Sequence, residues 1–303
     1  MNRRNFIRSA SFASLAFSLS DKLFAALPNA LEKGKKQFVG AHVWVYAASQ
    51  PGYDVSPILS QIFSDMAYAG FDGVETMEQP LRSPVYTRQI KELIEKHKIK
   101  LLGSSYSGDM WDKTKHNQII EDVDLIFENM ASVGGRTFGV SVGKPSGRKK
   151  TEEDFDNQAS LLKRLVTLGE KKGIILNLHN HTYEVENGMY DLRGTLKRIP
   201  DVRLGPDLNW LLRAGVNPLD FLKEFSTQIV FVHLRDQLSN GKWPESLGEG
   251  NVNFREIADV FNETGFHGDV VIELAHENGF VKTRPLKESL KMSRRYLKKT
   301  MNI

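Results

Sequence analysis

The most restrictive feature of this sequence is a regular alternation of short β-type runs with amphipathic helical stretches. The β-type runs cover residues 38–46, 73–77, 100–106, 136–142, 174–181, 202–208, 229–235 and 270–275. Apolar residues at helical spacing fill the intervals between them. Eight such repeats predict a single-domain (β/α)8 barrel, the TIM barrel of the α/β class, which is about 250 residues long.

Local signals support this organisation over an open doubly wound sheet. No G-x-G-x-x-G follows any of the β-type runs, so a dinucleotide-binding sheet is disfavoured. A long helix is expected from Thr151 to Lys172, because an acidic first turn complements the helix dipole. Residues 143–150 (GKPSGRKK) are expected to form a solvated loop. The C-terminal caps of four helices are expected at Gly70, Gly134, Gly173 and Gly265.

Composition removes several classes of protein and site. The chain has no cysteine, which excludes a disulfide scaffold, an iron–sulfur cluster, a thiolate zinc site and a cysteine nucleophile. No run of 18 or more apolar residues occurs, so a membrane-spanning helix is not expected. Any metal site in this chain must therefore use nitrogen and oxygen ligands.

Residues 1–26 have the layout of a signal peptide. A basic start containing Arg3-Arg4 precedes a serine-diluted apolar stretch and a small-residue exit at Ala25-Ala26. The twin-arginine pattern predicts export in the folded state, with a periplasmic destination. An amphipathic N-terminal helix of the mature protein is the alternative. The expected organisation is a signal peptide over 1–26, a linker over 27–37 and the barrel over 38–303.

The net charge of +4 follows from this leader. Residues 1–26 carry four basic side chains and one acidic one, and residues 27–37 contribute three lysines against one glutamate. Once these segments are subtracted, the barrel itself is close to neutral. The high isoelectric point therefore gives no support to a nucleic-acid partner.

Polar side chains interrupt the ends of five of the β-type runs. They are Glu75, His179, His181, Asp207, His233 and Glu273. Catalytic groups of a (β/α)8 barrel project from the carboxyl ends of its strands, so these side chains are expected to converge. A single such residue is more often a structural group, but four consecutive strands with one each favour a metal site. Imidazole and carboxylate ligands suit one divalent ion, Mn²⁺, Zn²⁺, Co²⁺ or Mg²⁺.

These motifs, in this order, resemble the xylose isomerase-like barrel superfamily of sugar isomerases and epimerases over residues 38–300. The resemblance is carried by AGFDGVE (69–75), LHNH (178–181) with Glu184, GPD (205–207), VHLRD (232–236), GEG (248–250) and IE (272–273). It implies a divalent ion held by His179, Asp207, His233 and Glu273. Many members carry Glu where this chain has His179, so His181 or Glu184 is an alternative ligand.

The resemblance also implies the chemistry. A divalent ion that binds the carbonyl and neighbouring hydroxyl of a keto-sugar favours loss of the adjacent proton and stabilises the enediolate. Return of that proton to the neighbouring carbon gives isomerisation, and return to the opposite face gives epimerisation. The candidate acid–base residues are Glu75, Glu184, Glu273 and His181. Expulsion of a β-substituent instead would make the protein a lyase or dehydratase of the inosose dehydratase type.

A small carbohydrate is the expected partner. The candidate substrate-binding residues are His42, Trp44, His181, Trp210, Arg235 and Glu249, the last on the glycine-rich segment 241–250. A sugar-binding barrel with a degenerate site is the non-enzymatic alternative. An endonuclease IV-like DNA-repair enzyme shares the fold, but it needs a multi-metal cluster, and export makes DNA an unsuitable substrate.

Overall fold

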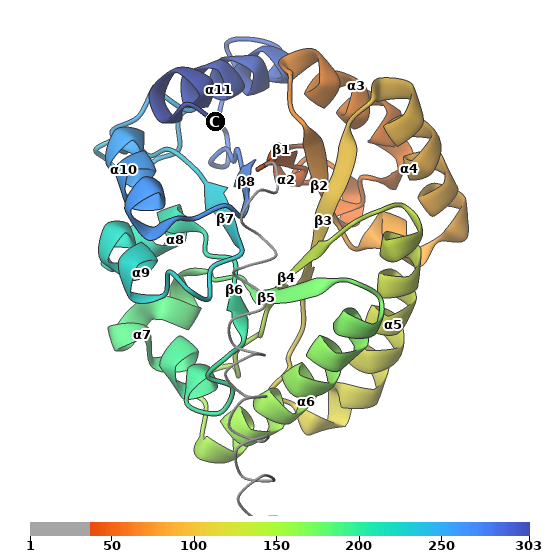
Figure 1. Cartoon of the computed structure of the whole chain (residues 1–303), viewed down its shortest axis with the longest axis vertical. Coiled ribbons are helices and arrows are strands. Elements are labelled where there is room, and N and C mark those ends of the chain that lie inside the picture. Colours follow the sequence, from red (N-terminus) through yellow and green to blue (C-terminus); the bar gives the residue numbers. More distant parts are fainter. Residues whose placement is uncertain (1–36) are drawn as a thin grey trace, which may run out of the picture. The chain divides into compact units, whose positions relative to one another are not determined.

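The computed structural model describes residues 37–303, which form one compact unit. Its eight parallel strands make a nearly closed ring with helices outside it (Figure 1), so the predicted single-domain TIM barrel is confirmed. The predicted leader and most of the predicted linker lie outside the described residues. The strands are β1 Val39–His42, β2 Gly73–Met77, β3 Lys100–Ser107, β4 Thr137–Ser141, β5 Ile175–Leu178, β6 Arg203–Leu204, β7 Phe231–Leu234 and β8 Asp269–Ile272.

Each strand is followed by one or more helices that cover the ring. They are α2 Trp44–Ala47, α3 Leu59–Ala69, α4 Pro84–His97, α5 His116–Ser132, α6 Glu152–Lys171, α7 Thr182–Leu196, α8 Leu208–Arg213, α9 Pro218–Glu224, α10 Phe254–Thr264 and α11 Leu286–Met301. Short 3₁₀ turns cover Pro51–Tyr53, Ser56–Ile58, Gln79–Arg82 and Lys113–Lys115. None of these helices, all within the described part of the chain, is long and apolar enough to span a membrane.

The sheet closes unevenly. Seven neighbouring pairs of strands form parallel ladders in the order β6-β5-β4-β3-β2-β1-β8-β7, and the register between β2 and β3 shifts once, at Val74/Glu75. Between β6 and β7 the structure has only the isolated bridges Leu204↔Ile229 and Asp207↔His233. Strand β6 is short because Pro206 follows it closely and has no backbone N–H to donate. We call this junction the β6–β7 seam.

Side chains alternate along the strands, so that apolar residues fill the interior of the barrel and polar residues line its carboxyl-terminal end, which we call the mouth. Leu102, Phe231 and Val271 pack together, with Phe38 and Ile175 against them. Since side chains two positions apart share a face, His233 follows Phe231 and Glu273 follows Val271 toward the carboxyl end of the ring. The Phe231 and His233 rings lie 5.0 Å apart. The sequence therefore places a hydrophobic plug beneath the charged residues.

Three local expectations need correction. The first β-type run ends at His42, and Trp44–Tyr46 belong to α2, whose first residue donates its N–H to the His42 ring. Strand β5 ends at Leu178, so His181 lies beyond it as the N-cap of α7. Lys150 is buried rather than solvated and lies 2.6 Å from the carboxylate of Asp191.

The predicted start of α6 is confirmed, and Gly70 and Gly265 are the C-caps of α3 and α10, whereas Gly134 and Gly173 lie one residue beyond the C-caps Val133 and Lys172. Helix α6 begins after Thr151, whose hydroxyl accepts the Asp154 N–H while the Asp154 carboxylate accepts the Thr151 N–H, a reciprocal capping box. The glycines predicted as helix ends, including Gly70 and Gly265, have positive φ angles. At these two positions the left-handed backbone favours glycine because it lacks a Cβ atom.

Candidate functional site

His233 on β7 occupies the centre of the polar mouth. Its Nε2 atom lies 2.5 Å from Glu75 Oε2 of β2, and its Nδ1 atom lies 3.0 Å from Glu273 Oε2 beyond β8. Burial alone would lower the pKa of His233, but the two carboxylates outweigh burial and raise the pKa to about 10. The predicted residues of strands two, seven and eight thus form one buried ion-paired group.

Three of the predicted metal ligands lie together. Donor atoms of His179, Asp207 and His233 all lie within 4.8 Å of one another. Burial holds the pKa of His179 well below its usual value, so that imidazole is neutral and has a lone pair to offer. Burial raises the pKa of Asp207, although the charge of Arg235 opposes it. Two imidazoles and a carboxylate are a donor set that suits a divalent transition metal or zinc.

Asp207 is fixed by the start of α8. Its Oδ1 atom accepts the N–H groups of Asn209 at 2.8 Å and Trp210 at 3.2 Å. The Asn180 side chain exchanges hydrogen bonds with the Asp207 backbone across the gap from β5. This leaves Oδ2 for the mouth, where Arg235 binds it.

Arg235 joins two of the predicted ligands. One guanidinium nitrogen, Nη2, lies 3.1 Å from Asp207 Oδ2 and 2.6 Å from Glu273 Oε1. Burial would raise the pKa of Glu273, but Arg235, His42 and His233 hold it well below its usual value. The guanidinium also lies over the Trp210 ring at 5.3 Å and the Trp243 ring at 4.8 Å. Arg235 therefore supplies positive charge at the ligands and contacts the aromatic wall of the site.

His42 faces the cluster from β1. Its Nδ1 atom accepts the Trp44 N–H at 3.0 Å, so the ring proton lies on Nε2, 3.0 Å from Ser105 Oγ. The His42 ring centre lies 5.4 Å from that of His233. Trp44 is half-buried beside this position and stacks on Tyr53. The structure therefore brings the predicted substrate residue His42 to the cluster, with Trp44 next to it.

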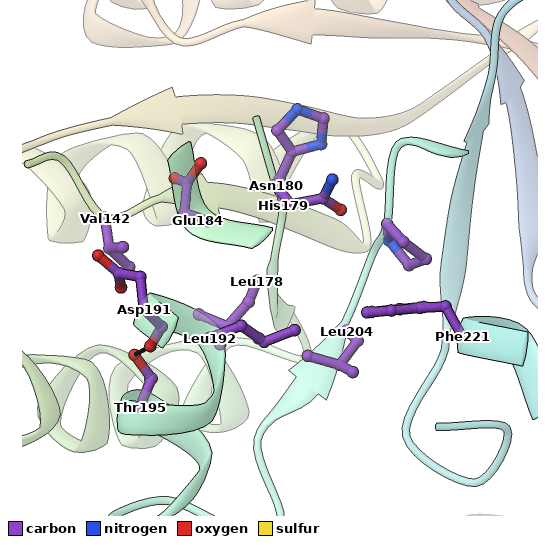
Figure 2. Close-up of a pocket in the computed structure, with 11 residues that line it drawn as sticks. Val142, Leu178, His179, Asn180, Glu184, Asp191, Leu192, Thr195, Leu204 and Phe221 are labelled. Atoms are coloured by element: carbon purple, nitrogen blue, oxygen red, sulfur yellow. Dashed lines mark hydrogen bonds between the residues drawn. The ribbon is translucent and has the colours of Figure 1, made fainter. Parts of the chain in front are cut away.

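His181 and Glu184 occupy different environments. The His181 side chain is 41 % exposed, and its ring centre lies 5.7 Å from Trp210. Glu184 is buried and lines a small cavity of about 20 Å³ between β5 and α7 (Figure 2). Its Oε2 atom accepts the His181 N–H at 2.7 Å. Burial raises the pKa of Glu184 to about 8, against the hydrogen bonds of Tyr183 and the His181 backbone.

The structure does not bring Glu249 to the cluster. Its carboxylate contacts the Arg284 guanidinium and accepts the Ser246 N–H at 3.0 Å. The same loop instead contributes Trp243, which donates its indole N–H to Asn209 at 2.8 Å.

Sequence reasoning missed Trp243, Ser105 and Ser141. Ser105 and Ser141 each bond a site histidine. Their positions at the ends of strand-like runs were the available signal.

Comparison with known proteins gives a consistent family. A profile of the xylose isomerase-like TIM barrel family matches residues 63–300. Inosose dehydratase of Lacticaseibacillus casei is 22 % identical over 278 residues, which cover 80 % of this chain and 90 % of that protein. A relative from Clostridium botulinum, also an inosose dehydratase, is 24 % identical over 280 residues, covering 80 % of this chain and 90 % of that protein.

Solved structures share the fold at low identity. D-allulose 3-epimerase of Methylomonas sp. superposes with a TM-score of 0.71 at 16 % identity, covering 88 % of this chain and 98 % of the other. 3-Keto-D-glucoside 4-epimerase of E. coli gives a TM-score of 0.67 at 17 % identity, covering 87 % of this chain and all of the other. At such identities these likenesses establish the architecture alone.

Proposed function

This chain belongs to the xylose isomerase-like TIM barrel family, and from that membership we propose that it is a metal-dependent sugar isomerase or epimerase. The proposed substrate is a ketose or keto-sugar, from which the enzyme removes the proton next to the carbonyl. The observation that carries the proposal is the convergence of His179, Asp207 and His233 at the mouth of the barrel, with their donor atoms within 4.8 Å.

The residues present fit a divalent ion. His179, Asp207 and His233 would hold it, and Glu273, 3.0 Å from His233, completes the proposed set of four. When bound, the ion supplies Lewis acidity that polarises a carbonyl and stabilises the charge of an enediolate. His233 must release a proton to bind, because both of its nitrogens now face carboxylates.

The other residues of the mouth would bind and orient the sugar. Arg235 has a buried Nε atom without a partner among the described residues, and its charge suits a hydroxyl or carbonyl oxygen. Trp210 and Trp243 meet edge to face at 5.6 Å and would form the apolar wall. We place the substrate against this wall because sugar rings present C–H faces that pack on aromatic rings.

Dehydration is the second candidate. The inosose dehydratase relatives favour it, and so does the distribution of bases in the mouth. The carboxylates of Glu75 and Glu273 are tied to His233, whereas His181 is half-exposed. A single available base on one side suits removal of one proton followed by loss of a β-hydroxyl, since epimerisation needs proton delivery from both faces.

We propose further that the protein is exported to the periplasm by its twin-arginine leader and acts on unphosphorylated sugars. Residues 1–26 carry the predicted leader and lie outside the described residues. Fractionation of cells that express the wild type and an Arg3→Lys, Arg4→Lys variant tests this. Periplasmic wild type with a cytoplasmic variant is expected, and equal distribution would contradict export.

The reaction is tested by incubating protein loaded with Mn²⁺, Co²⁺, Zn²⁺ or Mg²⁺ with a panel of ketoses and keto-glycosides in D₂O. Deuterium gain with the carbon skeleton retained indicates isomerisation or epimerisation, and loss of water or aglycone indicates elimination. Sugar binding without either change would identify a degenerate binding barrel. Asp207→Ala and His233→Ala are expected to abolish metal uptake, measured by elemental analysis. Uptake that survives both substitutions would refute the ligand assignment.

A further inference from the structure

The ring of His181 has four neighbours although it lies at the open mouth, and one of them is the proposed ligand His179, whose ring centre lies 5.1 Å away. Ser141 Oγ, at the end of β4, lies 3.0 Å from His181 Nδ1. Tyr183 stacks on the ring with an interplanar angle of 7° and a centre distance of 5.9 Å, and Trp210 lies 5.7 Å away. The second ring nitrogen, Nε2, has no hydrogen-bond partner in the described part of the chain. The orientation of the His181 ring is therefore fixed, and its Nε2 atom remains available to contact a substrate.

Glu184 lies beneath the mouth and helps to position His181. It accepts the His181 backbone N–H through Oε2, which lies 3.8 Å from Nδ1 and so does not hydrogen-bond the ring. Its other oxygen, Oε1, is buried, and Glu184 lines the small cavity of Figure 2 together with Asp191 and Thr195. A cavity of about 20 Å³ has room for about one water molecule. Glu184 thus acts on the site through His181.

From this geometry we propose that His181 is the proton-transferring residue and that Ser141 and Glu184 are its positioning residues. The proposal rests on the proposed function and specifies its acid–base group. A hydroxyl both donates and accepts, unlike a carboxylate, so Ser141 can support either neutral tautomer of His181. With the proton on Nδ1 and donated to Ser141 Oγ, Nε2 carries the lone pair.

The substrate gives up one proton to the His181 ring. The C–H bond next to the substrate carbonyl breaks, and a new N–H bond forms at His181 Nε2. The electron pair of the C–H bond moves to the carbonyl oxygen as the enolate forms. The resulting imidazolium keeps its Nδ1–H bond to Ser141 and later returns the Nε2 proton to a carbon or to a departing hydroxyl. General acid–base catalysis of this kind contributes about 10²–10⁴-fold in rate.

The test compares five variants with wild type in the full metal-loaded protein. Ser141→Ala is expected to lower kcat for deuterium exchange about tenfold or more, with KM within about twofold, and His181→Ala about 10²-fold or more. Glu184→Leu is expected to lower kcat similarly to Ser141→Ala. Glu184→Gln should lose less than about threefold, because an amide reproduces the neutral acid and still accepts the His181 N–H.

Thr137→Val is the matched control. Thr137 is a buried hydroxyl on the same strand as Ser141 at the opposite end of the barrel, where it donates to the Leu102 carbonyl. Its substitution tests the general effect of removing a buried β4 hydroxyl, and the exchange rate should stay at the wild-type value. Thermal melts of all variants identify any that fail to fold.

The measurements distinguish a wrong role for His181 and its neighbours from a wrong reaction for the whole protein. Crystal structures and ¹⁵N shifts of the imidazole report the His181 ring without any substrate, and Ser141→Ala should release it from its single orientation. An unchanged ring and kcat in Ser141→Ala would overturn the positioning role. Loss of exchange in Glu184→Gln equal to that in His181→Ala would make Glu184 the acid–base group itself. Wild type that exchanges no keto-sugar refutes the proposed function and, with it, proton transfer by His181.

Discussion

Arg235 places a permanent positive charge among buried carboxylates. It lies between Asp207 and Glu273, and all three side chains are at most 10 % exposed. Buried charges of this kind are costly to leave unpaired, because water no longer solvates them. Without a bound ion, the folded state depends on Arg235 to balance the negative charges of Asp207 and Glu273.

Arg235→Met should therefore destabilise the metal-free protein strongly. We expect the free energy of unfolding to fall by about 3–5 kcal/mol, since two buried carboxylates lose their shared partner. Urea denaturation monitored by circular dichroism measures it. Arg213→Met is the matched control, because Arg213 lies over the same tryptophan rings, but both side chains of its ion pair with Glu277 are partly exposed. That control should lose about 1 kcal/mol or less, and equal losses would contradict the assignment.

Helix α6 shows how a short sequence signal sets an element. Thr151 and Asp154 form its capping box, and Arg148 contacts the Asp154 carboxylate. The hydrogen bond from Arg148, together with those from Thr151, lowers the pKa of Asp154 to about 2, against the effect of burial. The helix start is therefore stabilised by the ionised form of this carboxylate.

Thr151→Ala should lower the free energy of unfolding by about 1 kcal/mol at neutral pH, as loss of an N-cap does.

The contribution of Asp154 to stability has a defined pH dependence. Its folded-state pKa is below the unfolded value of about 3.9, so its stabilisation is complete above about pH 4 and is lost as pH falls through 2. Denaturation of wild type and Asp154→Asn between pH 2 and 6 measures it. A stability difference that does not shrink toward pH 2 would contradict this linkage.

The loop after β7 is organised by one carboxylate. Asp236 accepts the backbone N–H groups of Gly248 at 2.8 Å and Gly250 at 2.9 Å through Oδ2, and that of Val252 at 3.1 Å through Oδ1. This loop carries Trp243 to the wall of the site. The position of the aromatic wall therefore depends on an acidic residue that does not itself contact it.

Asp236→Ala should loosen this loop with little change to the barrel. The N–H groups of Gly248, Gly250 and Val252 lose their acceptor, so we expect protease cleavage within residues 238–252 to accelerate by about tenfold or more, corresponding to at least 1.4 kcal/mol of local stability. Limited proteolysis with mass spectrometry measures the site and rate of cleavage. The exposed Lys242→Ala substitution is the control, and cleavage at the same rate in both variants would refute the role of Asp236.

At the scale of elements, the sequence predicted most helix boundaries because caps and glycines are local signals. It overextended the first strand, since Val45 and Tyr46 have β propensity but follow the hydrogen bond from Trp44 to His42 into a short helix. From the sequence, Glu249 was the expected substrate-binding residue of segment 241–250, whereas the structure places Trp243 of that segment at the site. Which side chain of a loop reaches a site depends on contacts with distant segments, here Arg284 and Asn209, and no local pattern records them.

At the scale of the whole molecule, the eightfold repeat of a β-type run and a helical stretch was sufficient to predict the barrel. Convergence of His179, Asp207 and His233 followed from it, because the carboxyl ends of parallel strands meet at one face. The pairing of Glu75 with His233 and the bridging by Arg235 did not follow. Those contacts depend on side-chain conformations across the barrel interior, where several partners compete for each charge.

The proposed ion would join the two sides of the β6–β7 seam, because Asp207 lies on one side and His233 on the other. A ligand that binds only the folded state at 100 times its dissociation constant stabilises that state by about 2.7 kcal/mol. We therefore expect metal to raise the melting temperature and to slow hydrogen exchange of the Leu204, Val230 and His233 amides. Calorimetry and hydrogen-exchange mass spectrometry measure both. Uniform slowing across the barrel, with none specific to the seam, would contradict this placement.

The uneven closure of the ring also bears on how long an ion would remain bound. Strands β1 and β8, from the two ends of the described chain, are joined by a regular ladder, so transient opening is expected at the sparsely bonded seam instead. Such an opening separates Asp207 from His233 without unfolding the remaining strands. The residence time of the ion would then be set by the lifetime of a few backbone hydrogen bonds beside it, and substitutions outside the ligand set that strengthen the seam would slow its release.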